Sequence, residues 1–208
     1  MKPKLIIFDL DGTLYDLKDV HEANYAMQVR FLQQQLKITK SDAISMLEAN
    51  SVYPIITDQS KSATELFARL GLDMNEWIHY REANFDVTKI DKSRAVPNLT
   101  IQQFAELCPL VLLSSNTYEN IVKILDYIEI DRKLFKDIYC SNHASMVEPF
   151  TKKKVMQIIA HDFKIDYHDI LSIGDRYQTD VAPLEALGGI GIAIKEKEEL
   201  EQIINQLL

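Results

Sequence analysis

The chain has 208 residues, of which 47% are hydrophobic and 26% charged, so it is long enough to bury the core of one domain, or of a domain with an insertion. Its formal net charge of −8 argues against nucleic acid and against an anionic membrane surface as partners, because both bind basic faces. The longest apolar stretches fall far short of the roughly 20 residues that span a bilayer, and the N-terminal MKPKLIIFDLDG has an acid where a signal peptide is apolar. The two cysteines, Cys108 and Cys140, form no C-x-x-C pair, so we expect reduced thiols and a cytoplasmic location.

Short apolar runs predict five strands that alternate, after the first, with helices. The runs cover residues 4–8, 110–113, 137–140, 169–173 and 189–194. Helical periodicity is found over residues 117–128, 152–163, 179–187 and 196–208. This alternation predicts an α/β fold with a doubly wound parallel sheet.

One interval breaks the alternation. Between the first two strands lie some 80 residues with no convincing strand pattern, too many for a crossover loop. Helical patterns fit residues 19–36, 41–50, 61–70 and 74–84; Thr39 or Ser41 is expected to cap the second helix and Gly71 to end the third. We therefore predict a core made of residues 1–13 and 97–208, and a small all-helical domain inserted over residues 14–96.

Two carboxylates stand at the end of the first strand. Asp9 and Asp11 are two residues apart, so in extended chain they project to the same side. Ligand sites of open α/β sheets lie at this carboxyl edge, and two neighbouring carboxylates there repel each other unless a cation is bound. A hard cation with oxygen ligands, magnesium above all, removes that cost, while Gly12 allows a sharp turn directly afterwards.

Further polar groups follow two other strands. Asp175 and Asp180 come after the strand at 169–173 and supply the additional acids that a magnesium site uses. Hydroxyl and amide side chains, in Ser114-Ser115-Asn116, follow the strand at 110–113 and can bind an anion. All three groups are expected at one edge of the sheet.

Taken together, these motifs resemble the haloacid dehalogenase (HAD) superfamily, and specifically its phosphatases, over nearly the whole chain. The first motif, D-x-D-G-T, matches residues 9–13; the second, a serine or threonine followed by asparagine, is similar to Ser115-Asn116; the fourth, G-D-x₄-D, matches residues 174–180. The resemblance implies a parallel sheet of order 5-4-1-2-3 and a helical cap between the first and second motifs.

The third motif departs from the family pattern. Many capped relatives have Lys-Pro here, whereas this chain has Glu148-Pro149. The spacing to Asp175 in relatives that use Lys-Gly places the family's lysine at Lys152, with Lys153 and Lys154 as the other possibilities. If none of these three lysines takes the role of the family's lysine, the alternative is a catalytically weak or inactive phosphate-binding or regulatory protein.

The resemblance implies a mechanism that also makes chemical sense for these residues. Asp9 is the expected nucleophile and forms an aspartyl-phosphate, and Asp11 is the expected general acid and then base. Magnesium is expected to bind Asp9, the Asp11 carbonyl and Asp175, and to neutralise the phosphate.

The remaining site residues are expected to bind the phosphate or to orient those that do. Lys152 and Ser115, with Asn116, are predicted to contact the phosphate oxygens. Asp180 is predicted to orient the lysine or a metal-bound water.

The predicted function is therefore magnesium-dependent hydrolysis of a small phosphorylated metabolite, of the nucleotide or sugar phosphate class. Asp11 argues against a dehalogenase, because a halide leaving group needs no proton. A phosphomutase is a further alternative, since it differs mainly in how well the cap excludes water.

Overall fold

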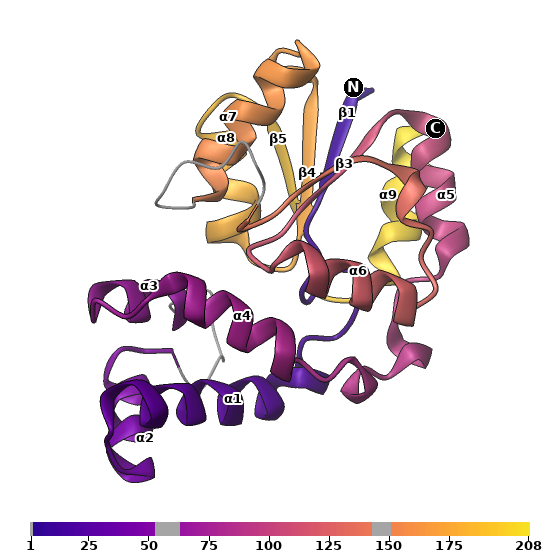
Figure 1. Ribbon diagram of the computed structural model, residues 1–208. Coiled ribbons are helices and arrows are strands. Elements are labelled where there is room, and N and C mark those ends of the chain that lie inside the picture. The colour runs from indigo at the N-terminus through magenta and orange to yellow at the C-terminus, as the bar shows by residue number, and fades with distance from the viewer. Residues whose placement is uncertain (1, 53–62, 143–150) are drawn as a thin grey trace. The chain divides into compact units, whose positions relative to one another are not determined.

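The computed structural model describes residues 2–52, 63–142 and 151–208, which form two compact units (Figure 1). One unit combines residues 1–17 with 90–208, and the other is residues 18–89. The predicted cap range, 14–96, encloses the second unit. Among the described residues, no helix combines the length and the apolarity that crossing a membrane requires.

The larger unit is built on a five-stranded parallel sheet of order β3-β2-β1-β4-β5, which confirms the predicted α/β class. The strands are β1 (Leu5–Phe8), β2 (Leu110–Leu113), β3 (Phe135–Tyr139), β4 (Ile170–Gly174) and β5 (Ile190–Ala193). β1 is central, and all its residues are buried because helices cover both faces of the sheet. The carboxyl end of β1 therefore lies between those of β2 and β4.

Helices lie on both sides of this sheet (Figure 1). They are α5 (Asn98–Leu107), α6 (Tyr118–Tyr127), α7 (Lys152–Phe163), α8 (Ala182–Glu185) and α9 (Glu199–Leu207). On one face, Leu5 and Ile7 share a buried cluster with Val155 of α7 and Leu184 of α8. On the other face, the ring of Phe8 packs edge-on against Phe104 of α5 at 5.0 Å.

Two helical features were not predicted. α5 directly follows Pro97, whose side chain cannot form the capping hydrogen bond that would predict the start of a helix. The helix predicted over residues 179–187 is instead a π-helical turn (Tyr177–Val181) followed by α8. Pro183 near the start of α8 has no N–H to donate, and the Ala182 N–H reaches back to the Tyr177 carbonyl. One wider turn followed by four α-helical residues is too short for the apolar pattern to differ from that of a single α-helix.

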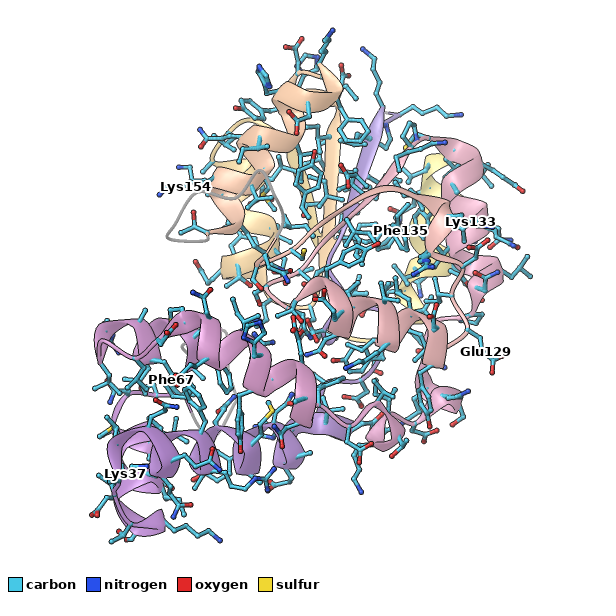
Figure 2. The ribbon with its side chains drawn as sticks, viewed as in Figure 1. Lys37, Phe67, Glu129, Lys133, Phe135 and Lys154 are labelled. Carbon is cyan, nitrogen blue, oxygen red and sulfur yellow. The ribbon has the colours of Figure 1, made fainter. Side chains whose placement is uncertain are left out.

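The smaller unit is all helical, with α1 (Lys18–Leu36), α2 (Lys40–Ala49), α3 (Ala63–Arg69) and α4 (Met74–Asn84). Thr39 caps α2, as predicted, by accepting a hydrogen bond from the Asp42 N–H. Gly71 follows α3 with a φ of 72°, a conformation that favours glycine. The core of this unit is aromatic: Phe67, labelled in Figure 2, packs on Phe31 and Trp77.

Short 3₁₀ turns complete the two units. They are η1 (Val87–Lys89) in the smaller unit, and η2 (Lys92–Arg94), η3 (Arg132–Leu134) and η4 (Tyr167–Asp169) in the larger.

Candidate active site

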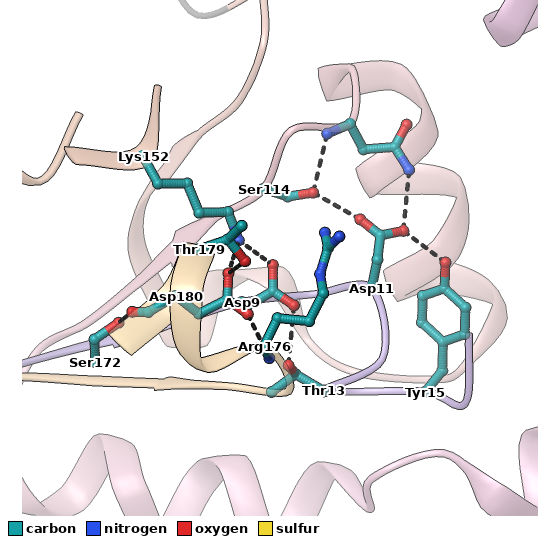
Figure 3. Close-up of polar contacts among 11 residues, drawn as sticks. Asp9, Asp11, Thr13, Tyr15, Ser114, Lys152, Ser172, Arg176, Thr179 and Asp180 are labelled. Carbon is teal, nitrogen blue, oxygen red and sulfur yellow. Dashed lines mark hydrogen bonds and ion pairs between the residues drawn. The ribbon is translucent and has the colours of Figure 1, made fainter. Parts of the chain in front are cut away.

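Asp9 directly follows the central strand and is almost fully buried. Its Oδ1 accepts a hydrogen bond from Lys152 Nζ at 2.5 Å, and its Oδ2 accepts one from the Thr13 hydroxyl at 2.9 Å. Its backbone N–H donates to the Ile173 carbonyl of β4. The carboxylate is thus held at both oxygens, with a lysine as direct partner (Figure 3).

Asp180 is the second carboxylate that contacts Lys152. Lys152 Nζ lies 2.7 Å from its Oδ1, which also accepts from the Thr179 hydroxyl. The other oxygen accepts from the backbone N–H of Arg176 at 2.9 Å. Ser172 of β4 donates to the Asp180 carbonyl, so both ends of this residue are fixed.

Asp175 completes this cluster, and one of its carboxylate oxygens, the buried Oδ1, has no hydrogen-bond donor among the described residues. Burial, together with the charges of Asp9 and Asp180, raises the pKa of Asp175 to about 8. Its carboxylate also lies so close to Gly12 that a Cβ there would clash with it, and Gly12 has a φ of 94°. Glycine at position 12 therefore serves both the turn and the approach of Asp175.

A cation fits this cluster. Asp9, Asp175 and Asp180 each offer a carboxylate oxygen, and these three atoms lie within 4.8 Å of one another. Three acids face one lysine here, and the unpartnered Oδ1 of Asp175 is the kind of buried oxygen that a metal ion satisfies. Asp9 and Asp175 are among the predicted metal ligands, whereas Asp180 was predicted only to orient the lysine or a metal-bound water.

The charges of the cluster shift the pKa of each member. Burial raises the pKa of Asp9 to about 6, although Lys152 opposes this. Burial also acts to raise the pKa of Asp180, but Lys152 and the hydrogen bonds from Arg176 and Thr179 together outweigh it, so this pKa is lowered. Burial alone would lower the pKa of Lys152, but the two carboxylates raise it. The lysine is therefore charged at neutral pH.

Asp11 belongs to a separate hydrogen-bond network. Its Oδ1 accepts from the Tyr15 hydroxyl at 2.6 Å and from the Asn116 amide at 3.3 Å. Its Oδ2 accepts from the Ser114 hydroxyl at 2.8 Å. Figure 3 shows Tyr15 and Ser114 pointing toward Asp11, from the loop after β1 and the end of β2.

The structure thus brings most of the predicted site residues into two neighbouring groups. Asp9, Lys152, Asp175 and Asp180 form the first, and Asn116 joins Asp11 in the second. Ser115 is exposed, and it is the adjacent, fully buried Ser114 that contacts Asp11. Lys153 and Lys154 are exposed on α7 (Lys154 is labelled in Figure 2), while Glu148 lies outside the described residues.

Sequence reasoning assigned no carboxylate contact to Thr13, Ser114 or Thr179, whose hydroxyls donate to the carboxylates of these groups. Each was adjacent to, or inside, a motif that the sequence did reveal. The signal was therefore present in the motifs, but it did not say which hydroxyl faces a carboxylate.

Solved structures with this fold include enzymes of more than one activity. A HAD phosphatase from Thermococcus onnurineus is 15% identical, with 98% of each chain covered and a TM-score of 0.65. A 2-haloacid dehalogenase from Pseudomonas syringae is 14% identical, with all of both chains covered and a TM-score of 0.58. A HAD-family enzyme from Bacteroides thetaiotaomicron, solved with magnesium and inorganic phosphate, is 16% identical over 97% of this chain and 98% of its own, with a TM-score of 0.54.

At these identities the likeness shows the fold alone, and no curated protein matches the chain. A family model supplies the stronger comparison. The model of haloacid dehalogenase-like hydrolases matches residues 3–188, from the strand before Asp9 to the end of the segment after Asp180. Since that match spans both carboxylate motifs and most of the chain, the protein belongs to the haloacid dehalogenase-like hydrolases.

Proposed function

We propose that this hydrolase is a magnesium-dependent phosphatase that cleaves a small phosphate monoester through an aspartyl-phosphate on Asp9. The observation that carries the proposal is the pairing of Lys152 with Asp9, beside a buried Asp175 oxygen that has no hydrogen-bond partner in the described part of the chain. A nucleophilic carboxylate is repelled by an anionic phosphate unless positive charge lies next to both. Lys152 supplies one such charge, and the Asp175 oxygen offers a place for another.

The chain's own residues account for the proton and bond changes. The Asp9 carboxylate attacks phosphorus, and the bond from phosphorus to the leaving oxygen breaks while Asp11 protonates that oxygen. Asp11 then takes a proton from water, whose oxygen attacks phosphorus and releases Asp9 and inorganic phosphate. Lys152 neutralises charge on Asp9 and on the phosphate throughout, and Asp180 holds the lysine.

Asp9, Asp175 and Asp180 are the carboxylates available to hold Mg²⁺, together with the backbone carbonyl predicted for Asp11. When bound, the ion supplies charge neutralisation and polarises the phosphoryl oxygens. The pKa of Asp9 near 6 leaves its carboxylate ionised at neutral pH, as a nucleophile requires.

Asp11 favours a phosphatase over a dehalogenase. Three donors hold its carboxylate in a defined position near the expected nucleophile. Halide departure needs no such group, whereas an alkoxide leaving group needs a proton. Release of halide from a 2-haloacid is therefore expected to be absent, while phosphate release is expected to be present.

A phosphate-release assay tests the proposal directly. The purified protein is offered p-nitrophenyl phosphate and a panel of nucleoside monophosphates and sugar phosphates, with Mg²⁺ or with EDTA. We expect turnover that EDTA abolishes, and the panel identifies the substrate class. No phosphate release from any member, with Mg²⁺ present, would refute the proposal.

Asp9→Asn separates the proposed nucleophile from general effects on folding. It is expected to abolish turnover and the mass increase of an acid-quenched phosphoenzyme, with the far-UV circular dichroism spectrum retained. Asp126→Asn, which changes an exposed carboxylate on α6, is the matched control and should behave as the wild type. Wild-type rates in Asp9→Asn would assign the chemistry to another residue.

A further inference from the structure

We infer that Tyr15 is a positioning residue, which holds the Asp11 carboxylate through its hydroxyl in the orientation needed to protonate the leaving oxygen. This inference rests on the proposed phosphatase function and deepens it. It concerns a residue outside the D-x-D-G-T motif, and its basis is one short hydrogen bond inside a closed turn.

The turn after β1 brings Tyr15 back onto Asp11. Leu14 N–H donates to the Leu10 carbonyl at 2.9 Å, and Gly12 N–H donates to the Tyr15 carbonyl at 3.1 Å. Gly12, with its φ of 94°, permits this reversal. The backbone at residues 11 and 15 is therefore paired, and the Tyr15 ring lies beside the carboxylate that it contacts.

The Tyr15 hydroxyl makes the shortest of the three hydrogen bonds to Asp11. Its distance of 2.6 Å compares with 2.8 Å for Ser114 and 3.3 Å for Asn116. A bond of this length between a hydroxyl and a carboxylate is charge-assisted and stronger than a neutral one. Tyr15 is also only 2% exposed, so water does not readily replace the phenol if it is removed.

The arrangement distinguishes positioning from general packing. Ser114 fixes one carboxylate oxygen, while Tyr15 and Asn116 fix the other. Among the described residues, the second oxygen without the tyrosine hydroxyl keeps the long Asn116 amide contact alone, and rotation of the carboxylate becomes easier. A misoriented acid slows only those reactions whose leaving group needs a proton.

The test compares two leaving groups in Tyr15→Phe. The p-nitrophenolate of p-nitrophenyl phosphate departs without a proton. The alkoxide of an alkyl phosphate such as glycerol phosphate needs a proton to depart. Because kcat/KM reports steps up to the departure of the leaving group, we expect Tyr15→Phe to lower it about 10- to 100-fold for the alkyl ester and less than about threefold for the aryl ester. Equal losses for both esters, or no loss for either, would overturn the inference.

Tyr139→Phe is the matched control. It removes a phenol hydroxyl that donates to the Asp162 carboxylate at 2.7 Å in the same unit, while the ring stays and so does the backbone carbonyl that accepts from the Ser114 N–H. It should change neither ester. Thermal unfolding of both variants checks the fold. A wild type that releases phosphate neither from these two esters nor from any member of the wider panel would refute the proposed function itself rather than this role of Tyr15.

Two unnatural residues at position 15 test the hydrogen bond at nearly constant size. 4-Aminophenylalanine keeps a donor on the ring, while 4-methylphenylalanine does not. The amine should restore alkyl phosphate turnover relative to the methyl variant, and this comparison also serves if Tyr15→Phe does not fold. If the ratio of kcat/KM for the alkyl ester to that for the aryl ester is equal in the two variants, the inference is contradicted.

Discussion

Lys152 Nζ lies 2.5 Å from Oδ1 of Asp9, although 143 residues separate the two in the sequence. The lysine is the first residue of α7, and Asp9 follows the central strand, so the sheet topology brings them together. The lysine also lies 2.7 Å from Asp180, and it is therefore shared by two carboxylates in a buried site. Its removal should have both a catalytic and an electrostatic effect.

Lys152→Met should lower kcat/KM for phosphate esters by about 10²–10³-fold, because it removes the charge beside Asp9, the proposed nucleophile. It should also tighten Mg²⁺ binding, since Asp9 and Asp180 then lose the lysine that competes with a cation for their oxygens. Steady-state kinetics and calorimetric Mg²⁺ titration measure the two effects. Lys153→Met, at the exposed neighbouring position, is the control and should alter neither.

A loss of similar size in Lys153→Met would show that the family's lysine had been assigned to the wrong position. Weaker Mg²⁺ binding in Lys152→Met would contradict the electrostatic part of the prediction.

Ser114 and Ser115 make a second pair of variants. Ser114 is fully buried and donates to Asp11, whereas Ser115 is exposed. We therefore expect Ser114→Ala to lower kcat/KM by about tenfold or more and Ser115→Ala by less than about threefold, in a phosphate-release assay. The opposite order would give the phosphate contact to Ser115, as the motif spacing predicts.

Which of the two serines enters the site could not be predicted from the sequence. Successive side chains leaving a strand point to opposite sides, so a shift of one residue decides which hydroxyl enters the site. Two adjacent serines satisfy the motif equally well. The hydrogen bonds of the fold distinguish them, and the sequence does not.

The sheet and the acids were easier to predict. β1 and β2 are continuous apolar runs because both sheet faces are covered, and the acids that follow β1 and β4 then share one edge. The contact between Tyr15 and Asp11 was not predictable, because it depends on how the turn at Gly12 closes. α5 was missed because Pro97 precedes it without a capping side chain.

Trp77 provides a test of the helical unit. It is 1% exposed, its ring centroid lies 4.8 Å from that of Phe67 and 4.9 Å from that of Phe31, and its Nε1 donates to the Thr64 hydroxyl. Trp77→Ala should lower the free energy of unfolding by about 3–5 kcal/mol, because it opens a cavity in this core. Denaturant unfolding followed by circular dichroism measures the loss.

Trp77→Phe is the milder comparison, since it keeps an aromatic ring and removes the hydrogen bond; it should cost clearly less than the alanine variant. A loss below about 1 kcal/mol in Trp77→Ala would mean that this aromatic cluster does not stabilise the unit.

Asp175 makes the stability of the metal-free protein depend on pH. Its pKa in the folded protein is raised to about 8, above the ordinary aspartate value that the unfolded chain has. The protonated form is thus favoured by folding, and this contribution is complete below about pH 4 and is lost as the pH rises through 8. Metal-free protein should therefore become less stable from pH 5 to pH 8, and Mg²⁺ should restore stability at pH 8 by binding the folded state.

Asp175→Asn removes both the titration and the charge. In EDTA at pH 8 the variant should be more stable than the wild type, by on the order of 2 kcal/mol, and the difference should shrink at pH 5, where Asp175 is already largely protonated. Mg²⁺ should raise the melting temperature of the wild type at pH 8 but not that of the variant. Asp126→Asn makes the same charge change at an exposed position and should behave as the wild type in each of these conditions. A melting temperature of Asp175→Asn below the wild type's at pH 8 without metal would contradict the raised pKa of Asp175. A melting temperature of the variant that still rises with Mg²⁺ would show that the cation does not bind at the Asp175 oxygen.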